Sequence, residues 1–443
     1  MDSEDRYYYD YTPTVYEVFE YCVFPSINGI LPTLKNLIII NFLFNVSIQS
    51  RLISETTYNG LSILLGFLLL FFTLPELSIL CIVGFICLTY VFLLTICKIQ
   101  KHRRLNLEYL TGFVCAIVLV ICEFGFNSDT WIQLRGFFMI ACMKIISFTS
   151  DLQRGEEYRS VLFFGYILCP ANCLFGPWVS VGEYKTLYKN PGKKNFNWAT
   201  RIICSLLNAV FFLTLSNCWG TYFIPDGSFK WFEAYRQALS FRSSHYFISY
   251  LSETSMIIAG FNNKKNEQKK GHWSYEITHP LDIEIPSSLV SVVISWNIPM
   301  HNFLKYYVYR TYLKYGRFRA IFITYFISSL LHGFNVEVAA VLLTIGIYSY
   351  VQLVVQDKIS SVFDSCLKVR HCKNCKHKFT RKDIRVKLVR CLFSLLTIFH
   401  SIYLGVLMDA VGDPNRESFY EKWSNLNFLS HWVMLVTYIF GII

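Results

Sequence analysis

Charged residues are scarce in this chain of 443 residues. They make up 16% of it, whereas 53% is hydrophobic and the mean hydropathy is +0.38. Soluble globular domains carry about 25% charged residues. The composition therefore excludes an ordinary soluble globule and favours a membrane protein.

Two further features are missing from the sequence. Met1–Cys22 is acidic and tyrosine-rich, and has neither the basic start nor the apolar core of a cleavable signal peptide. No internal duplication is visible, although many transporters contain one. Because a cleavable signal peptide is missing, insertion of the chain into the membrane must depend on its first true membrane span. Within an N-terminal interfacial segment of residues 1–27, Val15–Phe24 is expected to lie along the membrane surface as an amphipathic helix.

Acidic residues are outnumbered by basic ones, which gives a net charge of +11. In a soluble protein this excess would suggest nucleic acid. Here the basic residues lie in short loops between apolar runs, where the positive-inside rule places them on the cytosolic side of a membrane. We therefore predict contact with membrane lipid and no nucleic-acid partner.

Apolar runs recur along the whole chain. Some approach the roughly 20 residues that a helix needs to cross hydrocarbon, and the shorter ones are typical of tilted, broken or re-entrant pieces. The pattern predicts an all-α polytopic membrane protein with about ten to twelve transmembrane or re-entrant helices in a single membrane-embedded domain, residues 1–443. Among these runs are Leu61–Thr73, Leu77–Cys97, Leu107–Cys122, Phe137–Phe148, Ile202–Leu215, Leu289–Ile298, Ala320–Leu331, Val336–Val355, Leu388–Met408 and Phe428–Ile443.

The loops between the runs give the orientation. Lys98–Arg104 is basic and is placed in the cytosol, and so is the loop 357–387, because residues 368–390 hold ten Lys or Arg and one acid. The hydrophilic loop 262–273 is expected to be cytosolic too, although a patch facing anionic lipid is an alternative. Counting the crossings places His332 in the lumenal half and the C-terminus in the cytosol.

Two segments in the middle of the chain are informative. Met143–Arg159 carries several charges and is expected to be a solvated loop, in which Asp151 and Arg154 have the spacing of an i,i+3 ion pair. Pro170 and Pro177 interrupt any helix that follows. A broken helix in lipid requires protein or a water-filled cavity around it, so this segment is expected to form an interior wall.

Most of the fifteen cysteines lie inside apolar runs, where a cysteine behaves as a small hydrophobe. In the basic loop, Cys366, Cys372, Cys375 and His377 have spacing compatible with a Cys₃His zinc site. Palmitoylation of these juxtamembrane cysteines and free thiols are the competing interpretations. Because the C-x-x-C element occurs once, without a second half, we assign no metal ligand from the sequence.

His332 is the candidate for chemistry, because it lies between two apolar runs. Ionisable side chains at membrane depth are costly and tend to mark a pathway or a catalytic centre, and histidine takes up a proton near neutral pH. The alternative is a neutral histidine satisfied at a helix contact. Asn297 also follows an apolar run. Pro299 leaves the carbonyl of Ser295 without its helical donor, so Asn297 either caps a kinked helix or serves a site.

A cationic stretch, Lys305–Arg319, holds five Lys or Arg residues interleaved with tyrosines. This composition is typical of an interface that meets phosphates.

Several short sequence motifs resemble those of the membrane-bound O-acyltransferase family, and specifically those of the branch that acylates a serine of secreted Wnt proteins. The resemblance covers nearly the whole chain. At Glu337 the chain departs from vertebrate members of that branch, which carry a second histidine there. These motifs are Ser295-Trp-Asn-Ile-Pro-Met300, Leu330-Leu-His-Gly333, Asp151-Leu-Gln-Arg-Gly155, Phe175-Gly-Pro-Trp178, Leu239-Ser-Phe241, Leu251-Ser-Glu253, Pro280–Pro286, Ala339–Leu343 and Ser430-His-Trp432.

The resemblance implies an enzyme of the endoplasmic-reticulum membrane, built around a central tunnel, that transfers palmitoleoyl from CoA to a Wnt serine. It implies His332 as general base and Asn297 as the donor that holds the thioester carbonyl or its oxyanion. Acyl-CoA is the implied co-substrate, with no other cofactor. A lysophospholipid acyltransferase on the same scaffold and, from another class, a proton-relaying transporter are the alternatives. The residues expected to contact acyl-CoA are Trp296, Lys305, Arg310 and Lys314.

Overall fold

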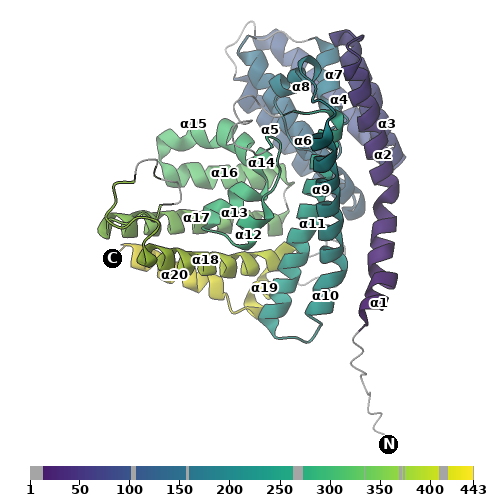
Figure 1. Cartoon of the computed structure of the whole chain (residues 1–443). Coiled ribbons are helices and arrows are strands. Elements are labelled where there is room, and N and C mark those ends of the chain that lie inside the picture. The colour runs from purple at the N-terminus through teal and green to yellow at the C-terminus, as the bar shows by residue number, and fades with distance from the viewer. Residues whose placement is uncertain are drawn as a thin grey trace, which may run out of the picture.

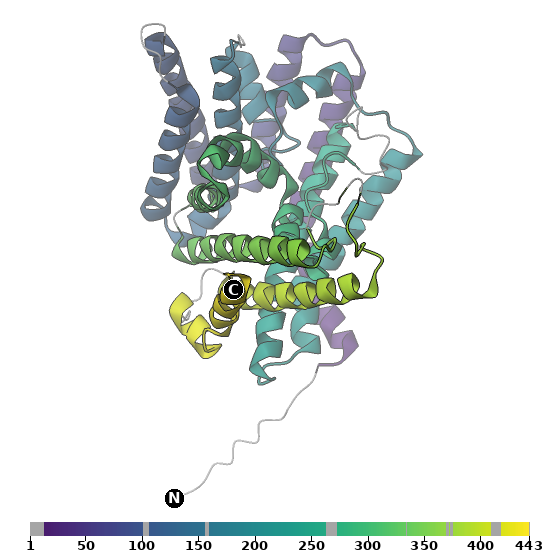
Figure 2. The same ribbon diagram turned by 90° about the vertical axis from the view of Figure 1, so that its left-hand side faces the viewer.

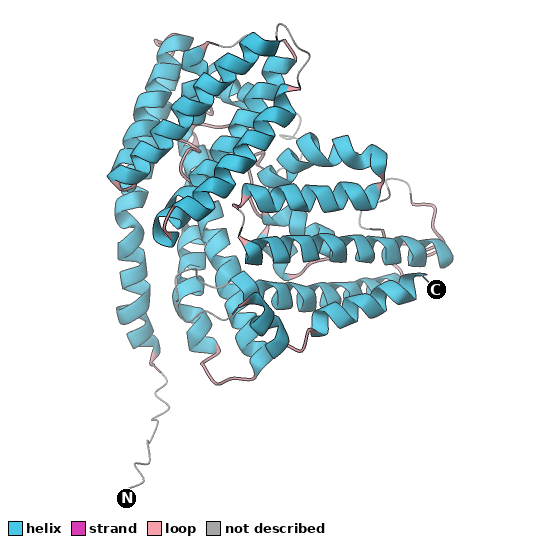
Figure 3. Cartoon of the chain, turned by 180° about the vertical axis from the view of Figure 1, so that it is seen from behind, coloured by secondary structure: helices cyan, strands magenta, loops and turns pink. Residues whose placement is uncertain are grey.

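A computed structural model describes residues 13–100, 106–155, 159–262, 273–333, 335–368, 372, 375–408 and 418–442. These residues are almost all helical, and a single bridge between Ser365 and Phe379 is the one strand-like pairing among them (Figure 3). The first half contains α1 (Val15–Val18), α2 (Phe24–Gln49), α3 (Glu55–Thr73), α4 (Glu76–Gln100), α5 (Leu107–Gly125), α6 (Ser128–Gln153), α7 (Ser160–Ile167), α8 (Val181–Lys189), α9 (Phe196–Thr214) and α10 (Gly220–Phe223). The second half contains α11 (Lys230–Ala259), α12 (Pro280–Glu284), α13 (Leu289–Trp296), α14 (Ile298–Leu304), α15 (Arg310–Tyr312), α16 (Arg317–Leu331), α17 (Val336–Val362), α18 (Ile384–Gly405), α19 (Phe419–Asn425) and α20 (Leu429–Ile442). Single π-helical turns join neighbouring helices at Phe19–Val23, Leu215–Trp219 and Lys305–Tyr309, and short 3₁₀ turns occupy Leu313–Tyr315 and Val406–Met408.

Eight helices of the described chain are long and apolar enough to cross a membrane, which confirms the multi-pass helical class. Shorter hydrophobic elements accompany them: α13, α16 and α20 have 8, 15 and 14 residues. The eight spans are Val15–Gln49, Glu55–Thr73, Glu76–Ile99, Leu107–Gly125, Thr130–Gln153, Phe196–Phe223, Val336–Val362 and Ile384–Met408.

The spans are not parallel. In Figure 1, α2, α9 and α11 stand upright, whereas α16, α17, α18 and α20 run across the view. Figure 2, turned by 90°, shows the green and yellow-green helices of the C-terminal part still lying across the upright ones. The two groups meet at α11, which packs against α9 and α2 on one side and α18 on the other.

The N-terminal helix differs from the prediction. Val15–Phe24 does not form a separate interfacial helix, because α1, a π-turn and α2 make one continuous helix to Gln49. Thr14 starts this helix with a capping box to Glu17. Residues 1–12 lie outside the described part of the chain.

The charged segment Met143–Arg159 is not a solvated loop up to Gln153, because that part belongs to α6. Lys144 is fully buried there. Its Nζ donates to the carbonyls of Tyr166 and Ile167 at 2.9 and 3.1 Å, and to Asn172 Oδ1 at 2.7 Å. A buried ammonium is tolerated because its donors all have acceptors.

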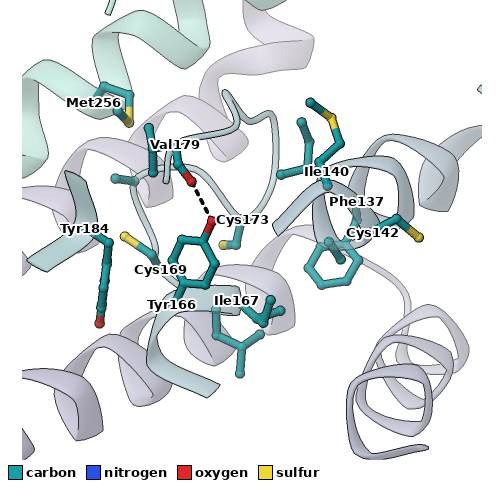
Figure 4. Packing of buried hydrophobic residues seen from close by; sticks show 14 of the residues in the cluster. Phe137, Ile140, Cys142, Tyr166, Ile167, Cys169, Cys173, Val179, Tyr184 and Met256 are labelled. Carbon is teal, nitrogen blue, oxygen red and sulfur yellow. Dashed lines mark hydrogen bonds between the residues drawn. The ribbon is translucent and has the colours of Figure 1, made fainter. Parts of the chain in front are cut away.

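Lys144 thereby holds the proline-containing segment after α7. This segment is largely buried, as expected of an interior wall. Figure 4 shows Tyr166 donating to the carbonyl of Val179 among buried apolar side chains, with an O···O distance of 2.5 Å. The predicted ion pair of Asp151 and Arg154 is also present, at 3.7 Å.

The cysteines divide into more classes than predicted. Cys115 and Cys142 are buried as small hydrophobes, but Cys87 and Cys204 are exposed on apolar helices, where a lipid-facing side chain is exposed in the isolated chain. Cys22 and Cys218 form a disulfide, which the sequence did not predict. It joins the first span to the π-turn after α9.

Candidate active site

His332 lies at the C-terminal end of α16, in the short connection to α17. The next residue, Gly333, has a φ of 80°, which other residues rarely adopt. A Cβ at Gly333 would collide with the carboxylate of Glu123 and would approach the Trp131 ring to 3.2 Å. Glycine therefore allows the histidine turn to pack directly against the hairpin of α5 and α6.

The neighbours of His332 are charged or polar. Trp131 donates its indole N–H to Glu123, and Glu123 interacts electrostatically with Arg135, one turn further along α6. Arg135 and His245 lie close enough to His332 to interact with it electrostatically. His332 is thus partly buried and lies within electrostatic reach of Arg135 and His245.

His245, on α11, links this cluster to the second predicted residue. Its ring stacks on Trp296, with centroids 4.3 Å apart and planes 4° from parallel. Its Nε2 is 2.8 Å from the carbonyl oxygen of Trp296. A carbonyl only accepts, so Nε2 carries the proton and Nδ1 is the acceptor of the neutral ring. His245 was not predicted from the sequence, where only its place in a long polar helix marks it.

Asn297 stands between α13 and α14 and caps the second of these helices. Its Oδ1 accepts from the backbone N–H of Met300 at 3.0 Å. Its Nδ2 makes no hydrogen bond with the described residues, so an amide donor is left for a ligand. The two readings of Asn297 are therefore compatible. The side chains of Asn297 and His332 share no direct hydrogen bond. His245 interacts electrostatically with His332 and stacks on Trp296, the residue before Asn297.

The carbonyl that Pro299 deprives of a helical donor is not left open. Ser295 O accepts from Thr278 Oγ1 and from the backbone N–H of His279, both at 3.0 Å. Ile298 N–H donates to Ile277 O at 2.9 Å. The segment 277–279 therefore fixes the break between α13 and α14, and no acceptor remains there for substrate.

A cavity of about 550 Å³, a usual volume for a ligand site, is lined by Ile298 and Pro299, the two residues that follow Asn297. Neither Asn297 nor His332 is part of its lining. Two cations of the stretch Lys305–Arg319 line the cavity, Lys305 and Arg310, and neither forms an ion pair with the described acids. The rest of the lining comes from residues 177–180 and 274–276, Glu183, Ile298, Pro299, Asn302 and Tyr306.

Two of the residues predicted to contact acyl-CoA lie elsewhere. Lys314 is absent from the described lining, and its Nζ lies 4.9 Å from the centre of the Tyr315 ring. Trp296 is also absent from that lining, because its ring stacks on His245. Of the four, the structure places Lys305 and Arg310 at the cavity.

Helix α6 runs between the two parts of the candidate site, the cavity with its cationic residues and the region of His332, so its length indicates how far apart they lie. At its C-terminal end, Arg154 donates to the hydroxyl of Tyr306, a cavity residue, at 2.7 Å. Near its N-terminal end, Arg135 interacts with His332. The two arginines are 19 positions apart, about 28 Å along a helix. The cationic residues of the cavity and the histidine therefore lie toward opposite ends of α6.

Comparison with known proteins identifies the class. The family model described as MBOAT, membrane-bound O-acyltransferase family, matches residues 67–372, and the chain belongs to this family. It is an acyltransferase by that membership.

Individual relatives are more specific. The chain is 34% identical to the protein-serine O-palmitoleoyltransferase porcupine of Anopheles gambiae, over 96% of this chain and 94% of that protein. It is 32% identical to the porcupine of Mus musculus, over 96% of both. Lysophospholipid acyltransferase 2 of Arabidopsis thaliana is 25% identical over 51% of this chain and 58% of its own length.

Proposed function

We propose that this protein transfers a palmitoleoyl group from CoA to a serine of a Wnt protein in the endoplasmic-reticulum membrane, as a single domain spanning residues 1–443. The observation that carries the site assignment is the stack of His245 on Trp296, which connects the segment of Asn297 to the interior histidine. Similarity to porcupine proteins over nearly the full chain supports the substrate class.

The chemistry follows from the two side chains. Neutral His332 takes the proton of the serine hydroxyl as its oxygen attacks the thioester carbonyl. Asn297 Nδ2 donates to the oxyanion of the tetrahedral intermediate. The carbon–sulfur bond then breaks, and the imidazolium returns its proton to the leaving thiolate of CoA. The products are the serine ester and free CoA, so the histidine is regenerated.

Binding of the acyl donor is assigned to the cavity. Its Lys305 and Arg310 offer charge to the phosphates of CoA, and its lining includes Ile298 and Pro299, the residues that follow Asn297. The acyl chain is proposed to continue from there into a tunnel through the bundle. Lys314 and Trp296 would then act outside the direct contact with CoA.

The orientation is consistent with a cytosolic donor and a lumenal acceptor. The basic loop after α17 marks the cytosolic side. The Cys22–Cys218 disulfide marks the opposite side, because disulfides persist in oxidising compartments such as the lumen. Gly192 N–H donates to Gly260 O at 2.7 Å, and Gln49 donates to Gly192 O at 2.7 Å. These contacts bring the far ends of α2 and α11 together, away from the disulfide.

The test is an acylation assay in cells lacking the endogenous enzyme, with a clickable palmitoleate and a co-expressed Wnt protein. His332→Ala is expected to abolish labelling at equal expression. His431→Ala is the matched control, because His431 bonds Tyr403 in the separate packing of α18 and α20. Full labelling by His332→Ala would remove the histidine from the mechanism.

The alternatives make different predictions in the same cells. A lysophospholipid acyltransferase would incorporate the label into lipid without any Wnt protein. Its relatives match only about half of this chain, which makes it the weaker reading. A transporter would move ions or substrate in proteoliposomes without consuming acyl-CoA, and family membership disfavours it.

A further inference from the structure

Three cysteines that acyl transfer does not use come together after α17. The sulfur atoms of Cys366, Cys372 and Cys375 all lie within 4.8 Å of one another. Cys366 is buried, Cys372 is half-buried and Cys375 is exposed. The chain therefore gathers three soft ligand atoms at one point, accessible from one side.

The spacing is that of ligands around a metal ion. Cys366 Sγ and Cys372 Sγ are 3.8 Å apart. Two thiolates at about 2.3 Å from a tetrahedral zinc ion are separated by about 3.8 Å. The distance therefore matches two corners of a zinc tetrahedron.

The backbone fixes the first ligand. Cys366 N–H donates to Phe379 O at 2.9 Å, and Phe379 N–H donates to Asp364 O at 3.1 Å. The carboxylate of Asp364 also holds His377 Nδ1, at 3.0 Å. The ring nitrogens of His377 lie outside the three-sulfur group, but a histidine oriented by a carboxylate through Nδ1 is a common arrangement next to metals. Because neither ring nitrogen of His377 lies with the three sulfurs, the fourth position is assigned to a water molecule.

The electrostatic setting favours thiolates. A zinc ion with three thiolates carries a net charge of about −1, and this loop is strongly basic. Arg390, on α18, lies close enough to Cys366 to interact with it electrostatically. On the cytosolic side, where positive charge places the loop, cysteines remain reduced and free to bind metal.

We propose that Cys366, Cys372 and Cys375 bind a structural zinc ion that ties the connection between α17 and α18. α17 begins four residues after His332, so the site anchors the far end of the helix that follows the catalytic turn. The ion takes no part in acyl transfer.

The test uses the full chain purified in detergent, without a histidine tag or chelator, from cells grown with zinc. Elemental analysis is expected to give close to one zinc ion per chain. Cys372→Ser combined with Cys375→Ser is expected to lower this to background. Cys391→Ser is the matched control, because Cys391 is exposed on α18 outside the cluster, and it is expected to keep the metal.

A second measurement tests the proposal if the double variant fails to fold. Wild-type protein stripped of metal and given Co²⁺ is expected to show the thiolate-to-cobalt charge-transfer band and the visible bands of a tetrahedral site. The proposal is overturned if wild-type protein holds no zinc and takes up none, if cobalt gives no thiolate band, or if the double variant keeps its zinc. Hydroxylamine-sensitive acyl groups on these cysteines, in place of zinc, would also overturn it.

Discussion

Asn297 shows how one side chain can serve a fold and a reaction together. Its carbonyl oxygen caps α14, while its amide nitrogen has no partner among the described residues. The two functional groups of one amide can therefore be separated by substitution.

Replacing Asn297 with aspartate keeps the cap, because aspartate is an equally good N-cap residue. It removes the Nδ2 donor and sets a negative charge where the oxyanion forms. We expect kcat to fall by about 10²–10³-fold, the cost of losing one oxyanion donor, or more because of the added charge. The measurement is Wnt acylation by purified Asn297→Asp, together with its thermal unfolding in detergent.

An unchanged unfolding temperature with lost activity assigns the amide to catalysis. Activity close to wild type would show that Asn297 acts only as a cap.

At this scale the sequence was informative where a polar residue interrupts an apolar run. His332 and Asn297 both satisfy that condition, and their roles stay predictions. His245 does not interrupt an apolar run, because it belongs to α11. This helix contains many polar residues, so a single histidine does not stand out in its sequence. Its role depends on a stacking partner 51 positions away, which only the folded chain reveals.

Among the elements, the segment from α14 to α15 contributes the two cationic residues of the cavity, Lys305 and Arg310. A π-helical turn at Lys305–Tyr309 follows α14 directly, and it ends where Arg310 begins α15. Lys305 and Arg310 both line the cavity, whereas Lys314, one turn further, contacts Tyr315. Position along this segment therefore decides which cations meet a ligand.

Lys305→Ala and Arg310→Ala are each expected to raise the KM for acyl-CoA about tenfold, because one charge-assisted contact contributes about 1.5 kcal/mol or more. Lys314→Ala is expected to have a smaller effect. Steady-state kinetics with varied acyl-CoA and fixed acceptor peptide provide the comparison. Equal effects at all three positions would show that the stretch acts through its total charge and not through the cavity.

Hydropathy predicted most of the long apolar helices and missed a long helix that is surrounded by protein. The cores of α3, α4, α5, α17 and α18 were all among the predicted runs. α11 was missed, although it is 30 residues long and central, because its interior faces carry buried hydroxyls such as Ser243, Ser252 and Ser255. A helix surrounded by other helices needs no lipid-compatible surface, so its sequence lacks the apolar signal.

For the whole molecule, two cysteine-based features are expected to mark opposite faces. The Cys22–Cys218 disulfide requires an oxidising compartment, and the thiols after α17 require a reducing one. This pairing agrees with the loop charges, and the proposed function expects the cationic residues of the cavity on the cytosolic side.

Glycosylation tags can check this orientation. A tag placed before Val15 or in the connection between α10 and α11 is expected to be glycosylated, and a tag beside Lys382 is not. The readout is an endoglycosidase-sensitive mobility shift of the full chain. Modification of the tag beside Lys382 alone would invert the topology and assign the cavity to the lumen.

The disulfide also bears on where this protein can be shortened. The stretch that matches the family model begins at residue 67, yet Cys22 binds the first helix covalently to the turn after α9. The match ends at residue 372, yet α18 lies against α11. A protein shortened to residues 67–372 would lack the first helix, which the disulfide holds, and α18, which packs on α11. Expression trials should therefore retain the segments on both sides of the matched stretch.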